Sequence, residues 1–220
     1  MKAQEDQLAE LKQIRNLMER SSRFIGLSGL SGIAAGVCAL AGALVLYIYL
    51  NALPFEGDYL NYQKAVHNTR WNMGYRTFLF LDGTLTALCA IISGIYFTMR
   101  KANKTGQSIF DKPAFRLLFN MAIPLLTGGV FCIALLYYNL IFLIPASTLV
   151  FYGLALVNGS KFTFHEVQYL GFAEIILGLI TLFIVNYSIE IWAIGFGVLH
   201  IIYGLLMESD NRRWTINNKI

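Results

Sequence analysis

The sequence predicts an all-α membrane protein, a bundle of six transmembrane helices with a short amphipathic helix at its N-terminus. The composition is the first basis for this prediction. Of the 220 residues, 56% are hydrophobic and only 14% are charged, and the mean hydropathy is +0.56. A soluble domain has roughly 45–50% apolar and about 25% charged residues, because polar groups must cover its surface. The composition therefore argues against a soluble globular domain, and its many aliphatic and aromatic residues exclude a disordered chain.

Six apolar stretches form the second basis. Each is long enough to cross the hydrocarbon core of a bilayer, which takes about 20 helical residues. We expect a single transmembrane domain at residues 24–207, with spans at 24–50, 77–98, 117–138, 139–157, 167–185 and 189–207, and a tail at 208–220. The third and fourth spans are divided at Tyr137-Tyr138-Asn139, because one helix over both would be about 60 Å long.

The distribution of positive charge predicts the orientation. Only three of the 17 Lys and Arg residues lie in connections on the side away from the termini, namely Lys64, Arg70 and Arg76. Lys and Arg accumulate in cytoplasmic connections. We therefore expect both termini to lie in the cytoplasm, which agrees with an even number of spans.

The N-terminal segment, residues 1–23, contains both acidic and basic residues and is not a signal peptide. Its apolar side chains recur at helical spacing at Leu8, Leu11, Ile14, Leu17 and Met18. This pattern predicts an amphipathic helix on the inner membrane face or leading into the first span. The alternative is a short coiled-coil segment that binds a partner.

Motifs of enzymes and cofactor-binding proteins are absent from the sequence. Cys38, Cys89 and Cys132 share no short spacing, and there is no nucleophile elbow, zinc-protease His pair or phosphate-binding glycine loop. We therefore expect no catalytic residues, no metal and no cofactor. The basic connection at residues 100–116 indicates contact with anionic lipid and not with nucleic acid.

Three ionisable residues lie inside predicted spans: Asp82, Glu174 and His200. Ionisable groups in hydrocarbon are costly, so each is a candidate for function. Asp82 lies in the outer part of the second span. Hydroxyl groups such as those of Thr84 and Thr86 could bond to it, or water could reach it from outside.

Glu174 and His200 occur in matching glycine patterns. Glycines stand three residues before and four residues after each of them, at Gly171, Gly178, Gly197 and Gly204. A tight turn joins the two spans, which are therefore antiparallel. The residue numbers of two facing residues then add up to a nearly constant value, the index sum. This sum predicts that Glu174 faces His200 and that glycines face glycines. The first span repeats the spacing at Gly29, Gly32 and Gly36, and we expect it to pack against the fifth and sixth spans.

Two functions are compatible with this pair. In the first, Glu174 and His200 are a buried structural lock in a non-catalytic structural, assembly or regulatory membrane component. Its partners would be the lipid bilayer and a second copy or another membrane protein. In the alternative, Glu174, His200 and Asp82 serve a proton-coupled transporter or channel for small solutes.

Two parts of the chain carry a resemblance to a known group. They are the opening from Met18 to Gly32, and the stretches Tyr152–Lys161 and Tyr169–Gly178. These stretches resemble a group of uncharacterised bacterial six-span membrane proteins, particularly from Bacteroidota. The resemblance implies an inner-membrane location and implies no activity or functional residues.

Overall fold

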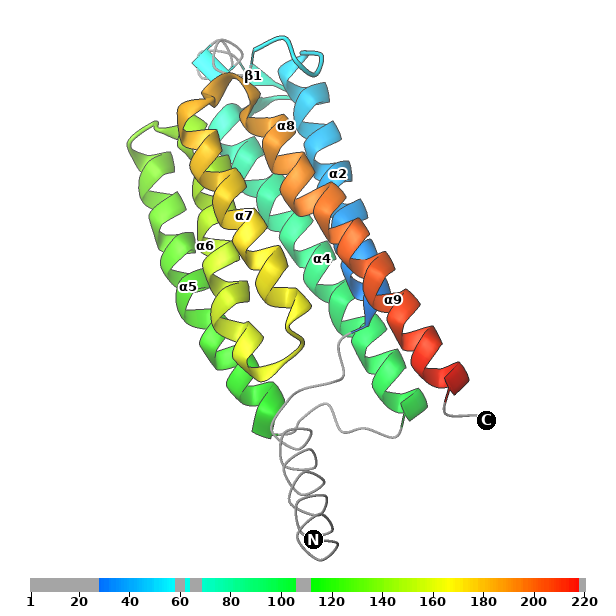
Figure 1. Ribbon diagram of the computed structural model, residues 1–220. Coiled ribbons are helices and arrows are strands. Elements are labelled where there is room, and N and C mark those ends of the chain that lie inside the picture. The colour runs from blue at the N-terminus through cyan, green and yellow to red at the C-terminus, as the bar shows by residue number, and fades with distance from the viewer. Residues whose placement is uncertain (1–27, 58–61, 64–68, 106–111, 218–220) are drawn as a thin grey trace, which may run out of the picture.

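The chain folds as an all-α bundle with six helices that are long and apolar enough to cross a membrane (Figure 1). The computed structural model describes residues 28–57, 62–63, 69–105 and 112–217. In this part of the chain the spans are Gly29–Leu50, Tyr75–Lys104, Lys112–Tyr137, Ile141–Phe162, Glu166–Phe183 and Val185–Ser209. The predicted number of spans is confirmed. The amphipathic helix expected at residues 1–23 lies outside the described residues.

The first five spans are built from helices and short 3₁₀ turns. In chain order the elements are α2 (Gly29–Leu50), β1 (Thr69–Arg70), β2 (Met73–Gly74), α4 (Tyr75–Thr105), α5 (Lys112–Tyr137), η1 (Ile141–Leu143), α6 (Ile144–Gly159), η2 (Ser160–Phe162) and α7 (Glu166–Phe183). β1 and β2 form a small antiparallel hairpin.

The sixth span is composite. It consists of η3 (Val185–Tyr187), α8 (Ser188–Trp192), the π-helix η4 (Ala193–Leu199) and α9 (His200–Asn217). We call residues 185–217 the last span.

Several helices are longer than the predicted spans. α4 begins at Tyr75 and continues to Thr105, and α5 begins at Lys112. α9 continues to Asn217, into the segment predicted as a tail. Hydropathy marks only the part of a helix that lies in hydrocarbon, whereas the helix itself continues as long as its backbone groups remain paired.

The break between the third and fourth spans lies where the sequence predicts it. α5 ends at Tyr137, and Asn139 adopts a left-handed conformation with φ of 61°. The N–H of Leu140 donates to the carbonyl of Leu135 at 2.8 Å, and the N–H of Asn139 donates to that of Leu136 at 3.3 Å. This pair of bonds is a Schellman motif, which satisfies the last carbonyls of a helix. The chain therefore turns back here.

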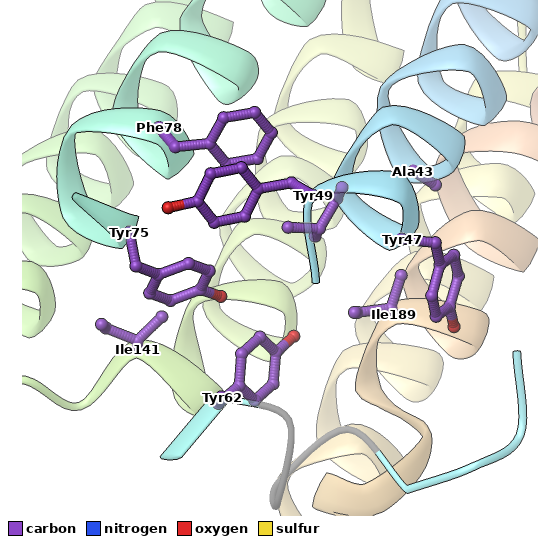
Figure 2. Close-up of a cluster of buried hydrophobic side chains, with 9 residues drawn as sticks. Ala43, Tyr47, Tyr49, Tyr62, Tyr75, Phe78, Ile141 and Ile189 are labelled. Atoms are coloured by element: carbon purple, nitrogen blue, oxygen red, sulfur yellow. The ribbon is translucent and has the colours of Figure 1, made fainter. Parts of the chain in front are cut away.

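An aromatic cluster closes the end of the bundle at which α2 ends and α4 begins (Figure 2). Tyr49 of α2 stacks on Phe78 of α4, with ring centroids 3.8 Å apart and planes 6° apart. Its hydroxyl donates to the carbonyl of Met73 in the hairpin at 2.9 Å. Arg70 donates to the carbonyls of Ile48 and Tyr49 at 2.6 and 3.0 Å. A cation at the C-terminal end of α2 complements the helix dipole, so the hairpin fixes α2 against α4.

By their contacts, the six spans pack in the order α4, α2, last span, α7, α6, α5. We call α4, α2 and the last span the first half, and α7, α6 and α5 the second half. α4 and α5 stand at the two ends of this order. In the most apolar stretch of each span, only 6% is buried in α4 and 11% in α5, against 33–39% in the other four spans. The two end helices therefore present most of their surface to the surroundings.

A glycine seam joins α2 to the last span in the first half. A Cβ added at Gly36 would lie 2.6 Å from the carbonyl oxygen of Gly197, and one added at Gly204 would lie 2.5 Å from that of Gly29. Gly32 has Gly204 as a neighbour in the same seam. Small residues let membrane helices approach at backbone distance. The expected packing of the first span on the sixth is confirmed.

A second glycine seam joins α6 to α7 in the second half. A Cβ added at Gly153 would lie 2.6 Å from the carbonyl oxygen of Gly171, and one added at Gly178 would lie 2.9 Å from that of Ala146. The prediction that the glycines of the fifth and sixth spans face each other is therefore wrong. Those of α7 face α6, and those of the last span face α2. An index sum gives the height at which two antiparallel helices meet, but not the rotation of either helix about its axis.

The expected packing of the first span against the fifth is likewise not found. α2 packs mainly on the last span and on α4, whereas α7 packs mainly on α6.

The α2 seam makes a specific prediction about stability. Gly36→Ala should lower the free energy of unfolding by about 1–3 kcal/mol, because the methyl group overlaps the facing backbone. The matched change Gly94→Ala should cause no loss, because an added Cβ at Gly94 meets nothing within 4 Å. Thermal unfolding of the purified variants in detergent measures both. Equal losses would show that the seam is not a tight contact.

Candidate functional site

The polar pair meets where the two halves join. His200 Nδ1 of the last span lies 3.4 Å from Glu174 Oε1 of α7. On the other side of the ring, His200 Nε2 lies 2.8 Å from the hydroxyl of Tyr152 of α6. His200 thus contacts both α6 and α7 of the second half. The structure brings together the two residues whose index sum predicts that they face each other.

The hydrogen bonds of His200 indicate the positions of its protons. Nδ1 lies 3.1 Å from the carbonyl oxygen of Gly195. A carbonyl oxygen only accepts, so Nδ1 carries a hydrogen. In the neutral ring Nε2 is then the acceptor, and the Tyr152 hydroxyl donates to it. Tyr152, His200 and Glu174 therefore lie in a row: the Tyr152 hydroxyl bonds the ring, and the Glu174 carboxyl contacts its other side without a hydrogen bond.

The Glu174 side chain is completely enclosed, with 0% of its surface exposed. Neither of its oxygens has a hydrogen-bond partner in the described part of the chain. The 3.4 Å contact with His200 is longer than an ordinary N–H···O bond. Most buried polar atoms are hydrogen-bonded, so a carboxyl group without donors is an exception with structural or chemical meaning.

Gly195 makes room for the Glu174 carboxyl. A Cβ added at Gly195 would lie 2.5 Å from Glu174 Oε2 and 2.5 Å from Leu149 Cδ2. Gly195 belongs to the π-helix η4, which stands directly before His200. π-helical turns inside α-helices often occur at functional sites. The wide turn and the missing side chain together accommodate the carboxyl between α6, α7 and the last span.

Aromatic rings and one further polar contact surround the pair. Phe196 packs beside both Tyr152 and His200, with its ring centroid 4.9 and 6.0 Å from theirs respectively. Trp192 Nε1 donates to Thr148 Oγ1 of α6 at 3.1 Å. The last span is thus tied to α6 at two heights, by Trp192 and by His200.

Asp82 lies elsewhere. It is half-buried on α4, which packs mainly on α2, whereas Glu174 lies on α7. The structure gives Asp82 no hydrogen bond or ion pair with any described residue, and Thr86 packs against Gly42 instead. The three ionisable residues therefore do not form one cluster. A bond to a threonine hydroxyl, one of the alternatives for Asp82, is not found among the described residues.

Sequence reasoning missed two members of the site. Tyr152 has no spacing that relates it to His200, because it belongs to α6 and reaches the ring from another helix. Gly195 stands two residues before Gly197 and could have been noticed as an additional glycine. Its contact with Glu174 depends on the π-helix, which has no clear sequence signal.

Metal binding has no evident ligand set here. Among the described residues there is no group of three or more His, Cys, Asp or Glu side chains that could hold a metal ion.

Comparison with protein-family models, with curated proteins and with solved structures gives no match to this chain. The geometry of the site is therefore the basis for its interpretation.

The contact between Gly195 and Glu174 can be tested directly. Gly195→Ala should destabilise the protein by about 1–3 kcal/mol, because the new methyl group displaces the carboxyl and the Leu149 side chain. Unfolding in detergent measures the loss.

A double-variant cycle separates the two clashes. Part of the penalty should disappear when Gly195→Ala is combined with Glu174→Ala, and a further part when it is combined with Leu149→Ala. A penalty that stays the same in both backgrounds would mean that Gly195 is required for another reason.

Proposed function

We propose that this polytopic membrane protein is a non-catalytic structural, assembly or regulatory component, and that the Glu174–His200 contact locks its two halves together. The observation that carries this proposal is the position of His200. Its two ring nitrogens reach α6 and α7, which both belong to the second half. The glycine seams lie within the halves, so the junction between them depends on polar contacts to a greater extent. A buried polar pair of this kind specifies how helices associate.

The proposal extends to location and partners. We infer an inner-membrane protein with both termini in the cytoplasm, related to the bacterial six-span group that the sequence resembles. The beginning of α2 and the end of α9 lie at the same end of the bundle (Figure 1), and the distribution of Lys and Arg along the sequence assigns this end to the cytoplasm. The exposed apolar faces of α4 and α5 meet the bilayer, a second copy or another membrane protein.

A proton-coupled transporter is the second candidate, and one observation favours it. Both oxygens of Glu174 lack a hydrogen-bond donor among the described residues, although a purely structural lock would normally satisfy them. Together with His200 and Tyr152 they form a row through which a proton could move. Asp82 is not part of this row.

The lock makes a prediction about coupling. Glu174→Ala and His200→Ala should each lower the unfolding free energy. The double variant should lose less than the sum, with an interaction of about 1 kcal/mol, as measured for polar contacts between membrane helices. Thr181→Val is the matched control, because the Thr181 hydroxyl bonds within its own helix at 2.7 Å. The losses of unfolding free energy caused by Thr181→Val and by His200→Ala should add up in the double variant. Additivity of the Glu174 and His200 changes would contradict the lock.

Proton movement separates the two candidates. The purified protein is reconstituted in vesicles with an internal pH-sensitive dye, and a membrane potential is imposed. As a lock, the wild-type protein should leave proton entry at the rate of protein-free vesicles. Faster entry that is lost in Glu174→Gln and slowed in Tyr152→Phe would overturn the non-catalytic assignment and establish transport.

A further inference from the structure

Three basic residues stand on two elements that pack together, two near the beginning of α5 and one in η2. Lys112 and Arg116 stand four residues apart on α5 and therefore share one face of that helix. Lys161 belongs to η2, which packs on α5. The end of α6 directly before η2 is close to α5 as well, because a Cβ added at Gly159 would lie 2.9 Å from Leu117 Cδ1. We call Lys112, Arg116 and Lys161 the basic corner.

Within the part of the chain that the structure describes, no acidic side chain pairs with the basic corner. All three side chains are exposed. Lys101 of α4, at the same end of the bundle, is different. Its Nζ lies 6.0 Å from the ring centroid of Phe164, and Glu208 of α9 is near enough to act on its charge. Lys101 therefore has contacts within the protein, whereas the described residues leave the basic corner open to an external anion.

An exposed apolar surface begins directly beside these charges. Phe115 is 72% exposed and Phe119, one turn further along α5, is 60% exposed. Most of α5 faces outward. An anion that binds here has hydrocarbon along one side of its site, because α5 continues from the corner across the membrane. This arrangement suits an amphipathic anion with a charged head and an apolar tail.

We propose that the basic corner binds the phosphate of an anionic phospholipid whose acyl chains lie along α5. The guanidinium of Arg116 can hold two phosphate oxygens at once, and the ammonium groups of Lys112 and Lys161 add point charges. The proposal does not depend on the Glu174–His200 lock. It uses the orientation inferred above, because the cytoplasmic leaflet is the anionic one. The general accumulation of Lys and Arg on the cytoplasmic side explains why there are many cations at this end of the bundle. It does not explain why three of them stand on two elements that pack together.

The test measures lipid affinity in detergent with full-length protein. Short-chain phosphatidylglycerol is titrated while the melting temperature is followed, since a ligand of the native state raises it. Arg116→Gln/Lys161→Gln is compared with Arg100→Gln/Lys104→Gln, which removes two exposed cations from α4 at the same end of the bundle. Melting without lipid shows whether each variant is folded.

We expect phosphatidylglycerol to stabilise the wild-type protein, and each removed corner cation to weaken binding about fivefold. The α4 double variant should bind nearly as the wild type does. Equal losses in the two double variants would overturn the proposal in favour of unspecific surface attraction. Equal stabilisation by phosphatidylcholine would show that the headgroup charge is not recognised. Equal stabilisation by inorganic phosphate would show a site for the free ion and not for a lipid.

Discussion

The absence of water from the bilayer core determines how this bundle is held together. Lipid tails are as apolar as leucine, so burying apolar side chains between helices gains little. Close backbone contact and polar bonds must supply the attraction. The chain uses the two means in different places. Glycines bring α2 to the last span and α6 to α7, while His200 joins the last span to α6 and α7. Loss of the polar junction would leave two glycine-packed halves with less to align them.

Features that depend on length, hydropathy and chain reversal can be predicted from the sequence. The six spans follow from the thickness of hydrocarbon, and the break after Tyr137 follows from the length that one helix would otherwise need. The approach of Glu174 to His200 follows because the turn between their spans is short, so equal distances from the turn mean equal depth. None of these inferences requires knowledge of which side chains touch.

Features that depend on helix rotation and local winding cannot be predicted in this way. The glycine patterns around Glu174 and His200 mark faces for close approach, but no index sum tells which neighbour each face meets. The π-helix η4 inserts a wide turn directly before His200 and so changes the angular position of every residue after it. Gly195 and Tyr152 enter the site through these two effects. The same holds for Asp82. Its depth in the span can be predicted from its position in the sequence, but its lack of a partner among the described residues cannot.

The enclosed carboxyl of Glu174 sets a condition on any function of the pair. With a neutral His200, an ionised Glu174 would be an unpaired charge surrounded by protein and hydrocarbon, which is strongly unfavourable. The pair is neutral overall when it holds one proton in addition to the N–H of the neutral ring, whether this proton resides on the carboxyl or on the imidazole. A structural lock is satisfied by either arrangement and requires no exchange with water. A relay requires the proton to leave, which creates that unpaired charge unless another proton arrives at once. Tyr152 is the group placed to supply or accept it, because its hydroxyl bonds the ring nitrogen that faces away from Glu174. The same three residues therefore serve as a lock while Tyr152 stays isolated from solvent, and serve as a relay once water reaches it.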